Sequence, residues 1–556
     1  MVTYKQEVKE KSRQEIWTKA VNKLTTERNK QKILKPEYIK LLWNYSFNDI
    51  LKDLYFPNNK IIDSWIDFSN CTYPPKTPEQ LKIAYFCGPE PENDLQVLIN
   101  LGIKIENVWA IESDAKMYSI AINNIKKIYP TLKIFNGDIS DLVKAISFKF
   151  DIIYLDFTAP LFSKESKPLL KINLIFEHNA LSDLGILITN SSLPESNAGN
   201  IEFLSSYFRS QTFIESPIIT GDNSEVYYSE GADAHSLYTK EEIQDMLDND
   251  IDWLDEDCDF EEKIKDNFDS AYSAFCSHYP VIIANYAQPT TRVSSIPSLR
   301  KMFFKKNLDK IKECIEKISV PSNNIFMDID FEKLENNNYL DRFDFSGGEL
   351  HEQHEDFPIW NFISRLTRSK HDVCKYWAQQ FTKKNNGCLS LETIQLYDLL
   401  RNAQYSYKEI LSENLSNSIK NIMKEIPDRK GGIFCDVPMP HLWMELALNH
   451  LGNAYHINTD QQWRAKYKAK KHEMYLDIFV FDSCRSLYDW LPMLDLYGEY
   501  LSSIERQIIV RSCIDAIKKQ CHYSSFYSYF GAHLIGEKTK SWSKFGALDI
   551  RKNLND

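Results

Sequence analysis

The feature that most constrains this chain is a strand, a tight turn, a helix, a second strand and an acidic residue in direct succession. An apolar run over residues 83–86 ends at Cys87 and Gly88, and a second apolar run, 108–111, ends at Glu112. The segment between them has the apolar periodicity of an amphipathic helix. This is the pattern of a βαβ nucleotide-binding unit, in which the glycine lets the backbone approach a ligand and the acid accepts ribose hydroxyls.

The turn after the first strand is acidic. A single glycine is followed by Pro89, Glu90, Pro91, Glu92 and Asp94, where the usual dinucleotide fingerprint has more than one glycine. A pyrophosphate needs a neutral or positive cradle at the helix start, and here it would face carboxylates. S-adenosylmethionine (SAM) carries a sulfonium cation and an ammonium group, so the charge of this turn favours SAM over a dinucleotide.

The residues that follow repeat the alternation of strand and helix. Strands are predicted at 132–136, 150–156 and 184–190, and helices at 116–127, 140–146 and 171–182. Such alternation predicts a doubly wound, mostly parallel α/β sheet. Asp138 and Asp156 follow two of these strands, at the carboxyl ends where such sheets bind ligands.

The order of these motifs resembles the class I SAM-dependent methyltransferase fold over about residues 78–220. The shared order is a turn after the first strand, an acid after the second, Gly-Asp after the third and acid-x-x-x-Pro after the fourth. The resemblance implies that SAM is the cofactor. It places the following residues around SAM: Cys87, Gly88 and Glu90 at its methionine side, Glu112 at the ribose and Asp138 at the adenine amine.

The same resemblance implies an acceptor side after the fourth strand. Asp156 is the candidate catalytic group, which would accept a proton or a hydrogen bond, and Phe157 and Pro160 belong to the wall that faces the substrate. The chain departs from the family in two places. Its loop lacks the second glycine, and Asp156-Phe-Thr-Ala-Pro160 differs from the Asn/Asp-Pro-Pro-Tyr/Phe motif of adenine and cytosine amino-methyltransferases.

Three of these residues also have a purely structural interpretation. Cys87 suits a small packing position under the turn, because a free cysteine behaves as a small hydrophobe. Asp138 suits the N-cap of the helix predicted from residue 140, and Asp156 suits an ordinary loop position.

The chain has 556 residues, a length that predicts two to four domains. We expect an N-terminal helical segment (1–75), a Rossmann-like methyltransferase-type domain (76–320) with an acidic helical insertion at about 225–270, a linker (321–357) and a C-terminal domain (358–556) of helical and mixed α/β structure. The apolar run 275–287 is interpreted as a late strand of the first sheet.

Basic residues, Lys9 and Arg13 among them, dominate the start of the N-terminal helical segment. Ile16, Trp17 and Val21 recur at helical spacing along it. We interpret the basic residues as a solvated helix face whose apolar stripe packs on the next domain, with a phosphate-binding arm as the alternative.

A second basic segment lies near residue 465. Basic and aromatic side chains alternate there, as a surface for phosphates and stacked bases would require, and the candidate substrate-binding residues are Trp463, Arg464, Lys466, Lys468 and Lys470. In an extended strand the four cations share one face, opposite Ala465, Tyr467 and Ala469. The alternative is an edge strand whose lysines prevent unwanted pairing.

Composition excludes several other classes. The net charge of −12 argues against a protein coated for nonspecific nucleic-acid binding. The 11 cysteines contain no Cys-x-x-Cys pair, and His351 and His354 lack a known metal spacing, so we predict no metal site. No long uncharged apolar run or signal sequence is present, and we expect a cytoplasmic protein without membrane association.

The sequence therefore predicts a SAM-dependent methyltransferase-like protein that acts on a large substrate, with nucleic acid favoured. The C-terminal half would recognise the substrate or a protein partner. Methyl transfer needs an in-line approach to the sulfonium, so catalysis would consist mainly of positioning. The alternative is a catalytically degenerate nucleotide- or SAM-binding scaffold or sensor that works in a protein complex.

Overall fold

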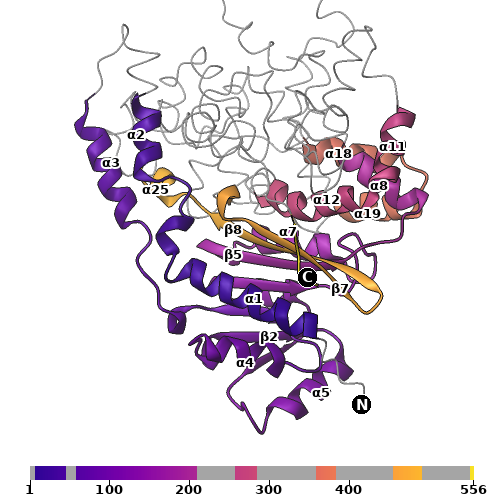
Figure 1. Ribbon diagram of the computed structural model, residues 1–556, viewed down its shortest axis with the longest axis horizontal. Coiled ribbons are helices and arrows are strands. Elements are labelled where there is room, and N and C mark those ends of the chain that lie inside the picture. The colour runs from indigo at the N-terminus through magenta and orange to yellow at the C-terminus, as the bar shows by residue number, and fades with distance from the viewer. Residues whose placement is uncertain are drawn as a thin grey trace, which may run out of the picture.

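The computed structural model describes residues 7–44, 58–208, 257–284, 358–382, 455–490 and 551–555. The strands in these ranges are β1 Ile83–Phe86, β2 Val108–Glu112, β3 Lys133–Asn136, β4 Phe150–Asp156, β5 Leu181–Ser192, β6 His456–Ile457, β7 Trp463–Ala469, β8 His472–Asp482 and β9 Lys552–Asn553. They form one nine-stranded sheet in the order β3-β2-β1-β4-β5-β8-β7-β9, and β6 pairs with β8 (Figure 1).

The first five strands are parallel, and β8 runs antiparallel to both β5 and β7. The order β3-β2-β1-β4-β5 is that of a doubly wound sheet, whose ligands bind where the strand order reverses. In this chain the reversal lies between β1 and β4. The predicted fold class is confirmed: a mixed α/β structure around a mostly parallel sheet, consistent with a Rossmann-like methyltransferase fold.

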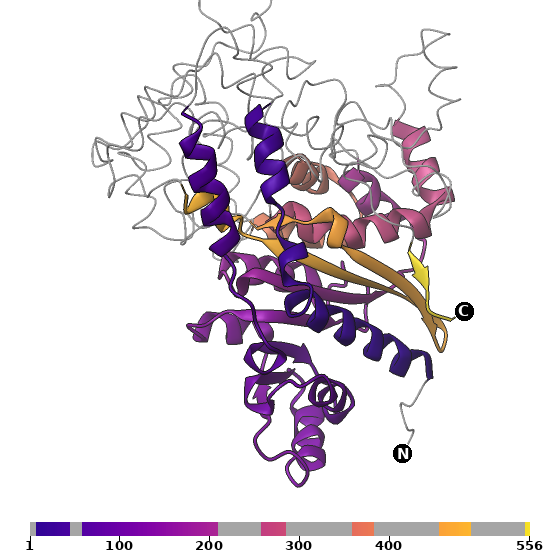
Figure 2. The ribbon, with the colours of Figure 1, turned by 60° about the vertical axis from the view of Figure 1, so that its left-hand side comes forward.

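Helices cover both faces of the sheet (Figures 1 and 2). One face is covered by α1 Glu7–Leu24, α4 Glu92–Asn100 and α5 Ala115–Ile125. The other is covered by α6 Ile139–Ala145, α7 Pro168–Glu177 and α12 Phe268–Ile282. On the same side, α8 Ala198–Phe208 and α11 Asp257–Asp266 pack on α12, and α18 Pro358–Arg368 and α19 Asp372–Thr382 pack on α8. In β4, Ile152 and Tyr154 pack on the first face, whereas Ile153 and Leu155 pack on the second. This burial on both sides explains why residues 152–155 of β4 are a continuous apolar run.

The remaining helices are short or lie beside the sheet. They are α2 Pro36–Asn44, α3 Lys60–Cys71, α25 Arg485–Tyr488 and the 3-10 helices η1 Arg28–Gln31, η3 Pro78–Gln80, η4 Ile105–Asn107 and η10 Thr459–Gln461. The indole nitrogen of Trp65 in α3 donates to the Ser486 carbonyl at 2.7 Å, and its ring stacks on Trp490 at 4.9 Å. These contacts attach the N-terminal helices to the end of β8.

The structure corrects one prediction of secondary structure. The sequence predicts a strand over residues 275–287, but Phe268–Ile282 is the helix α12, with Pro280 inside it. An apolar run fits a buried helix as well as a buried strand, and here packing on β8 and α8 decides for the helix.

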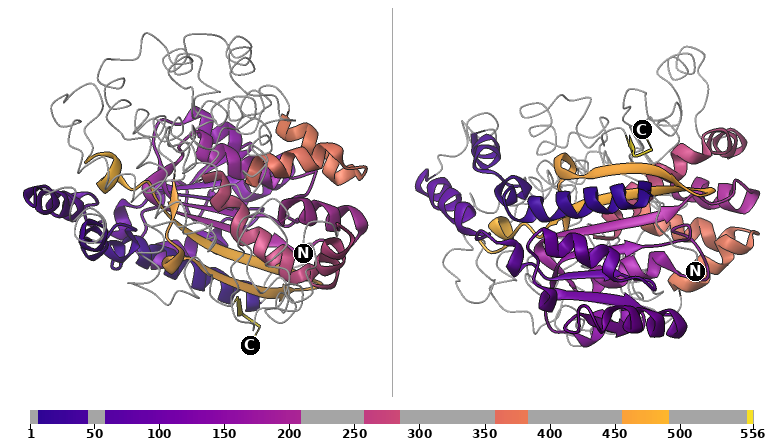
Figure 3. Two further views of the ribbon diagram at one scale, coloured as in Figure 1. Left: turned by 90° about the horizontal axis from the view of Figure 1, so that it is seen from above. Right: turned by 60° about the horizontal axis from the view of Figure 1, so that its bottom comes forward.

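The strands β7 and β8 come from the segment that we assigned to a C-terminal domain, and they lie in the same sheet as β1–β5. The pairing of β5 with β8 runs from Leu184 opposite Asp482 to Ser192 opposite Met474. The strands β7 and β8 form a hairpin, and the helix α1 packs against β7 and β5 (Figure 3, right). The linker 321–357, His351 and His354 lie outside the described residues. Among the helices that are described, none is both long and apolar enough to span a membrane.

Candidate functional site

A cavity of about 320 Å³ lies at the carboxyl ends of β1, β2 and β4. This is within the range of roughly 300–1,000 Å³ typical of small-molecule sites. Seven of the residues predicted from the sequence line it: Cys87, Gly88, Glu90, Glu112, Asp138, Asp156 and Phe157. The structure thus brings the predicted cofactor residues and the candidate catalytic acid together at the point where the strand order reverses.

The loop after β1 leaves room for a ligand at Gly88. Its φ of +56° lies in the left-handed region that favours glycine, and a Cβ built there would meet no atom within 4 Å. Cys87 is buried beside it, and its amide donates to the Ile111 carbonyl at 3.2 Å. Burial raises the pKa of the Cys87 thiol well above its usual range, which disfavours the reactive thiolate form.

Glu112 closes β2 and is held by the turn that follows. Its Oε1 accepts from the amide of Asp114 at 2.8 Å. Asp114 in turn caps α5, because its Oδ1 accepts from the amides of Lys116 and Met117 at 2.8 and 2.9 Å. Among the described residues no donor contacts Oε2 of Glu112, so this oxygen can accept from a ligand in the cavity.

Asp138 is the N-cap of α6. Its Oδ1 accepts from the Ser140 amide at 2.9 Å, and its Oδ2 forms an ion pair with Nζ of Lys171 at 2.7 Å. Burial alone would raise the pKa of Asp138, but Lys171 and the Ser140 amide hold it below its ordinary value. The predicted N-cap role of Asp138 is therefore confirmed. A ligand that contacts Asp138 would share its carboxylate with Lys171.

Asp156 is fixed by its neighbour in the sheet. Nδ2 of Asn190 donates both to Oδ1 of Asp156 and to the hydroxyl of Tyr467, each at 2.8 Å. Asn190 belongs to β5 and Tyr467 to β7, so a strand from the C-terminal part of the chain is linked through one amide to the acid in the cavity.

The sequence does not predict the cations that reach the cavity. The interpretation of Arg13 as part of a solvated face is wrong: it lines the cavity, and its Nε lies 3.2 Å from Oδ2 of Asp94. The indole nitrogen of Trp17 donates to Oδ1 of the same carboxylate at 2.8 Å. Burial raises the pKa of Asp94 despite these two partners. The predicted apolar stripe of α1 is indeed buried against the sheet.

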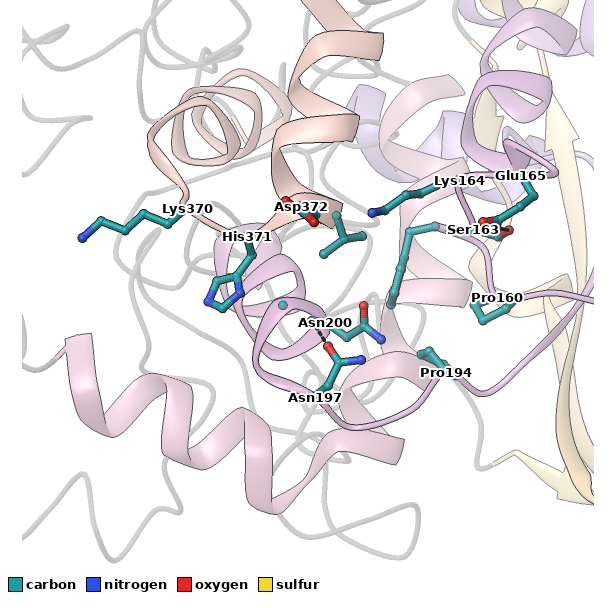
Figure 4. Close-up of a pocket in the computed structure, with 13 residues that line it drawn as sticks. Pro160, Ser163, Lys164, Glu165, Pro194, Asn197, Asn200, Lys370, His371 and Asp372 are labelled. Carbon is teal, nitrogen blue, oxygen red and sulfur yellow. Dashed lines mark hydrogen bonds between the residues drawn. The ribbon is translucent and has the colours of Figure 1, made fainter.

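Pro160 lies apart from the other predicted residues, in a second cavity of about 660 Å³ (Figure 4). The other walls of this cavity come from residues 162–165, 194–200 and 370–373. The Oδ1 of Asn197 accepts from the amide of Asn200 at 3.0 Å, and Nε2 of His371 lies 3.2 Å from Glu202. The segment 156–160 thus borders both cavities, because its first residues line the smaller and Pro160 lines the larger.

The basic residues near 465 do not line either cavity. The alternation is confirmed, since Ala465, Tyr467 and Ala469 pack in the core beside α1. Arg464, however, is only 3% exposed and its guanidinium contacts Ser277 in α12 at 3.4 Å. A row of four accessible cations is therefore wrong; Lys468 and Lys470 are exposed and Lys466 is half-buried. Trp463 packs under Nζ of Lys19, 5.1 Å from its ring centre.

No protein-family model and no curated protein matches the chain. Among solved structures, similarity is found to an S-adenosylmethionine-dependent methyltransferase from Clostridium acetobutylicum, with 23% identity over 32% of this chain and a TM-score of 0.17. The match covers 62% of that protein, less than two thirds of its length. Agreement at this level carries no argument about function.

Proposed function

We propose that the cavity at the ends of β1, β2 and β4 binds SAM and that the protein is a SAM-dependent methyltransferase. The observation that carries the proposal is the arrangement of Gly88, Glu112 and Asp156 around one cavity at the reversal of the strand order. Doubly wound sheets bind their ligands at this point.

The charge of the cavity supports SAM over a nucleotide with a pyrophosphate. Five carboxylates and three basic side chains line it, which gives a formal charge of −2. Two of the basic side chains, Arg13 and Lys171, are already paired with Asp94 and Asp138. A cationic ligand is favoured in such a site, whereas a pyrophosphate would be repelled.

The roles follow from position. Gly88 would allow the close approach of the amino-acid part, Oε2 of Glu112 would accept from the ribose hydroxyls, and Asp138 would lie at the adenine end. When bound, SAM would supply a methyl group on a sulfonium cation. Asp156, held by Asn190, would orient the acceptor or accept its proton. Phe157 would form part of the wall on that side.

A large acceptor fits the surroundings of Asp156, and nucleic acid remains the acceptor that we propose. The second cavity begins at Pro160, on the same segment as Asp156. Lys466, Lys468 and Lys470 on the hairpin of β7 and β8 would contact its phosphates. The hydrogen bonds from Tyr467 through Asn190 to Asp156 connect that hairpin to the site.

One observation favours the alternative, a SAM-binding scaffold without transferase activity. The segment after β4, Asp156-Phe-Thr-Ala-Pro160, differs from the Asn/Asp-Pro-Pro-Tyr/Phe motif of adenine and cytosine amino-methyltransferases. A scaffold of this kind would bind SAM but would transfer no methyl group.

The test measures binding and transfer separately. One-site binding at a hundred times Kd stabilises a fold by about 2.7 kcal/mol, so SAM should raise the thermal unfolding temperature whereas NAD should not. Incubation with methyl-labelled SAM and DNA, RNA or protein then measures whether the labelled methyl group is transferred to any of these acceptors. Stabilisation by NAD but not by SAM would refute the proposal; stabilisation by SAM without transfer to any acceptor would favour the scaffold.

A further inference from the structure

We infer that Arg13, on the N-terminal helix α1, binds the carboxylate of the cofactor's amino-acid group and thereby selects ligands that carry one. This inference rests on the proposed function, because it names a contact within the same cavity. Arg13 lies far outside the βαβ unit in sequence and reaches the cavity only through the packing of α1 on the sheet.

The carboxylate of Asp94 holds the guanidinium of Arg13 in position. Its Nε lies 3.2 Å from Oδ2 of Asp94, and the other oxygen of that carboxylate is held by the Trp17 indole at 2.8 Å. The side chain of Arg13 retains 22% of its exposure, and no acceptor among the described residues contacts its two terminal nitrogens. A guanidinium has five donors in a rigid fork. The pair with Asp94 is made through Nε and leaves the terminal nitrogens for a second anion.

The surroundings of Arg13 match a zwitterion better than a simple anion. Glu90 and Asn93, which are joined by a hydrogen bond of 2.9 Å, line the same cavity and belong to the same loop and helix start as Gly88. An ammonium group would be attracted to Glu90, and a carboxylate beside it would be attracted to Arg13. The other paired cation, Lys171, lies against Asp138, at the end proposed for adenine. Charge-assisted contacts of this kind are the strong hydrogen bonds in proteins.

If the pair of Arg13 and Asp94 had a purely structural role, a different effect on ligand affinity would be expected. If Arg13 only neutralised a buried carboxylate, its removal would weaken every ligand of the cavity to the same extent. Recognition of a carboxylate instead requires that the effect depends on the ligand. Decarboxylated SAM is the matched probe, because it keeps the sulfonium, the amine and the adenosine and lacks only the carboxylate.

The experiment measures the affinity of the full chain for SAM and for decarboxylated SAM by calorimetry, in the wild type and in Arg13→Met. We expect Arg13→Met to bind SAM at least tenfold more weakly and to bind decarboxylated SAM within about twofold of the wild type. Equal losses of affinity for both ligands, or no loss for SAM, would overturn the inference while leaving the proposed function in place. Failure of the wild type to bind either ligand would overturn both.

Two further variants distinguish a loss of ligand recognition from misfolding of the variant protein. Arg13→Met leaves Asp94 buried without its cation, so Arg13→Met combined with Asp94→Asn removes both charges, and the same ligand dependence is expected in that background. Lys23→Met is the control on the same helix, because Lys23 donates to Gln461 and does not line the cavity. It should bind both ligands as the wild type does.

Discussion

The side-chain amide of Asn190 donates to the carboxylate of Asp156 at 2.8 Å. Asn190 is 1% exposed and its Nδ2 also donates to Tyr467. Because an amide nitrogen donates and a carboxylate oxygen accepts, the nitrogen end of the Asn190 amide is the one that faces Asp156. The acid is therefore held in one orientation at the boundary between the two cavities.

The first prediction concerns Asp156 itself. Asp156→Asn should bind SAM within about threefold of the wild type and should lower methyl transfer by about a hundredfold or more, the usual contribution of a general acid or base. Calorimetry and a labelled-methyl assay measure the two effects. Asp141→Asn, on the exposed side of α6, is the control. A variant that loses SAM binding but turns over bound SAM normally would show that Asp156 faces the cofactor.

The second prediction concerns Glu112. Glu112→Gln keeps the size of the side chain but removes the charge that would accept the ribose hydroxyls. SAM binding should weaken by about 1 kcal/mol, because hydrogen bonds to a charged group contribute roughly 1.5–3 kcal/mol and those to a neutral amide oxygen about 0.5–1.5 kcal/mol. Glu106→Gln, an exposed residue just before β2, should bind SAM normally. Equal affinity of Glu112→Gln and the wild type would reject the ribose assignment.

The third prediction concerns the basic hairpin. Changing Lys468 and Lys470 to Gln should weaken nucleic-acid binding and reduce the slope of log affinity against log salt by roughly 0.7–0.9 for each phosphate that is no longer neutralised. Lys116 on α5 and Lys127 just after this helix are equally exposed, and their replacement by Gln serves as the control. If both double variants have the same slope, the hairpin does not bind phosphates, and its lysines would serve instead to prevent unwanted strand pairing.

A fourth prediction follows from the pair of Asp138 and Lys171. The pKa of Asp138 lies below its ordinary value, because Lys171 and the Ser140 amide together outweigh the effect of burial. The stability that Asp138 contributes is thus complete above its unfolded pKa, about 3.9, and is lost as the pH falls through its folded pKa. Lys171→Met should therefore lower the free energy of unfolding at pH 7, and the difference from the wild type should shrink below about pH 4.

Urea denaturation at pH 7, 5 and 3.5 measures this difference. Lys144→Met, which replaces an exposed lysine on α6, should match the wild type at each pH. A difference between Lys171→Met and the wild type that stays constant with pH would mean that Lys171 stabilises the fold by packing and not by its charge.

The fifth prediction concerns a buried ion pair that holds the C-terminal residues against the sheet. NH1 of Arg551 lies 3.0 Å from Oδ2 of Asp477, and neither side chain is exposed. Arg551→Ala should lower the free energy of unfolding by about 3–5 kcal/mol, because it leaves a buried carboxylate without its cation. Replacing both residues, Arg551→Met with Asp477→Leu, should restore part of that stability, because the buried charge is removed but the Ala465 and Leu476 carbonyls still lose their bonds to Arg551. A double variant as unstable as the single one would contradict this account.

The sequence by itself determined the parts of the protein that depend on neighbouring residues. The apolar run before Gly88, the periodicity of α4 and the acid at the end of β2 lie within one βαβ unit, so local pattern and turn chemistry were sufficient to predict them. The same holds for the ends of β3 and β4, and hence for the placing of Asp138 and Asp156 around a cavity with Gly88 and Glu112.

The tertiary structure alone decided the contacts between distant segments. Arg13 meets Asp94 only because α1 packs across the sheet, and Asn190 meets Tyr467 only because β8 pairs with β5 and brings β7 beside it. Arg464 has the spacing of an exposed cation, yet α12 covers it. The apolar run of α12 fits a helix or a strand, and its neighbours choose between them. Local periodicity shows which face of a helix or strand is apolar. Which other segment covers that face depends on the packing of the whole chain.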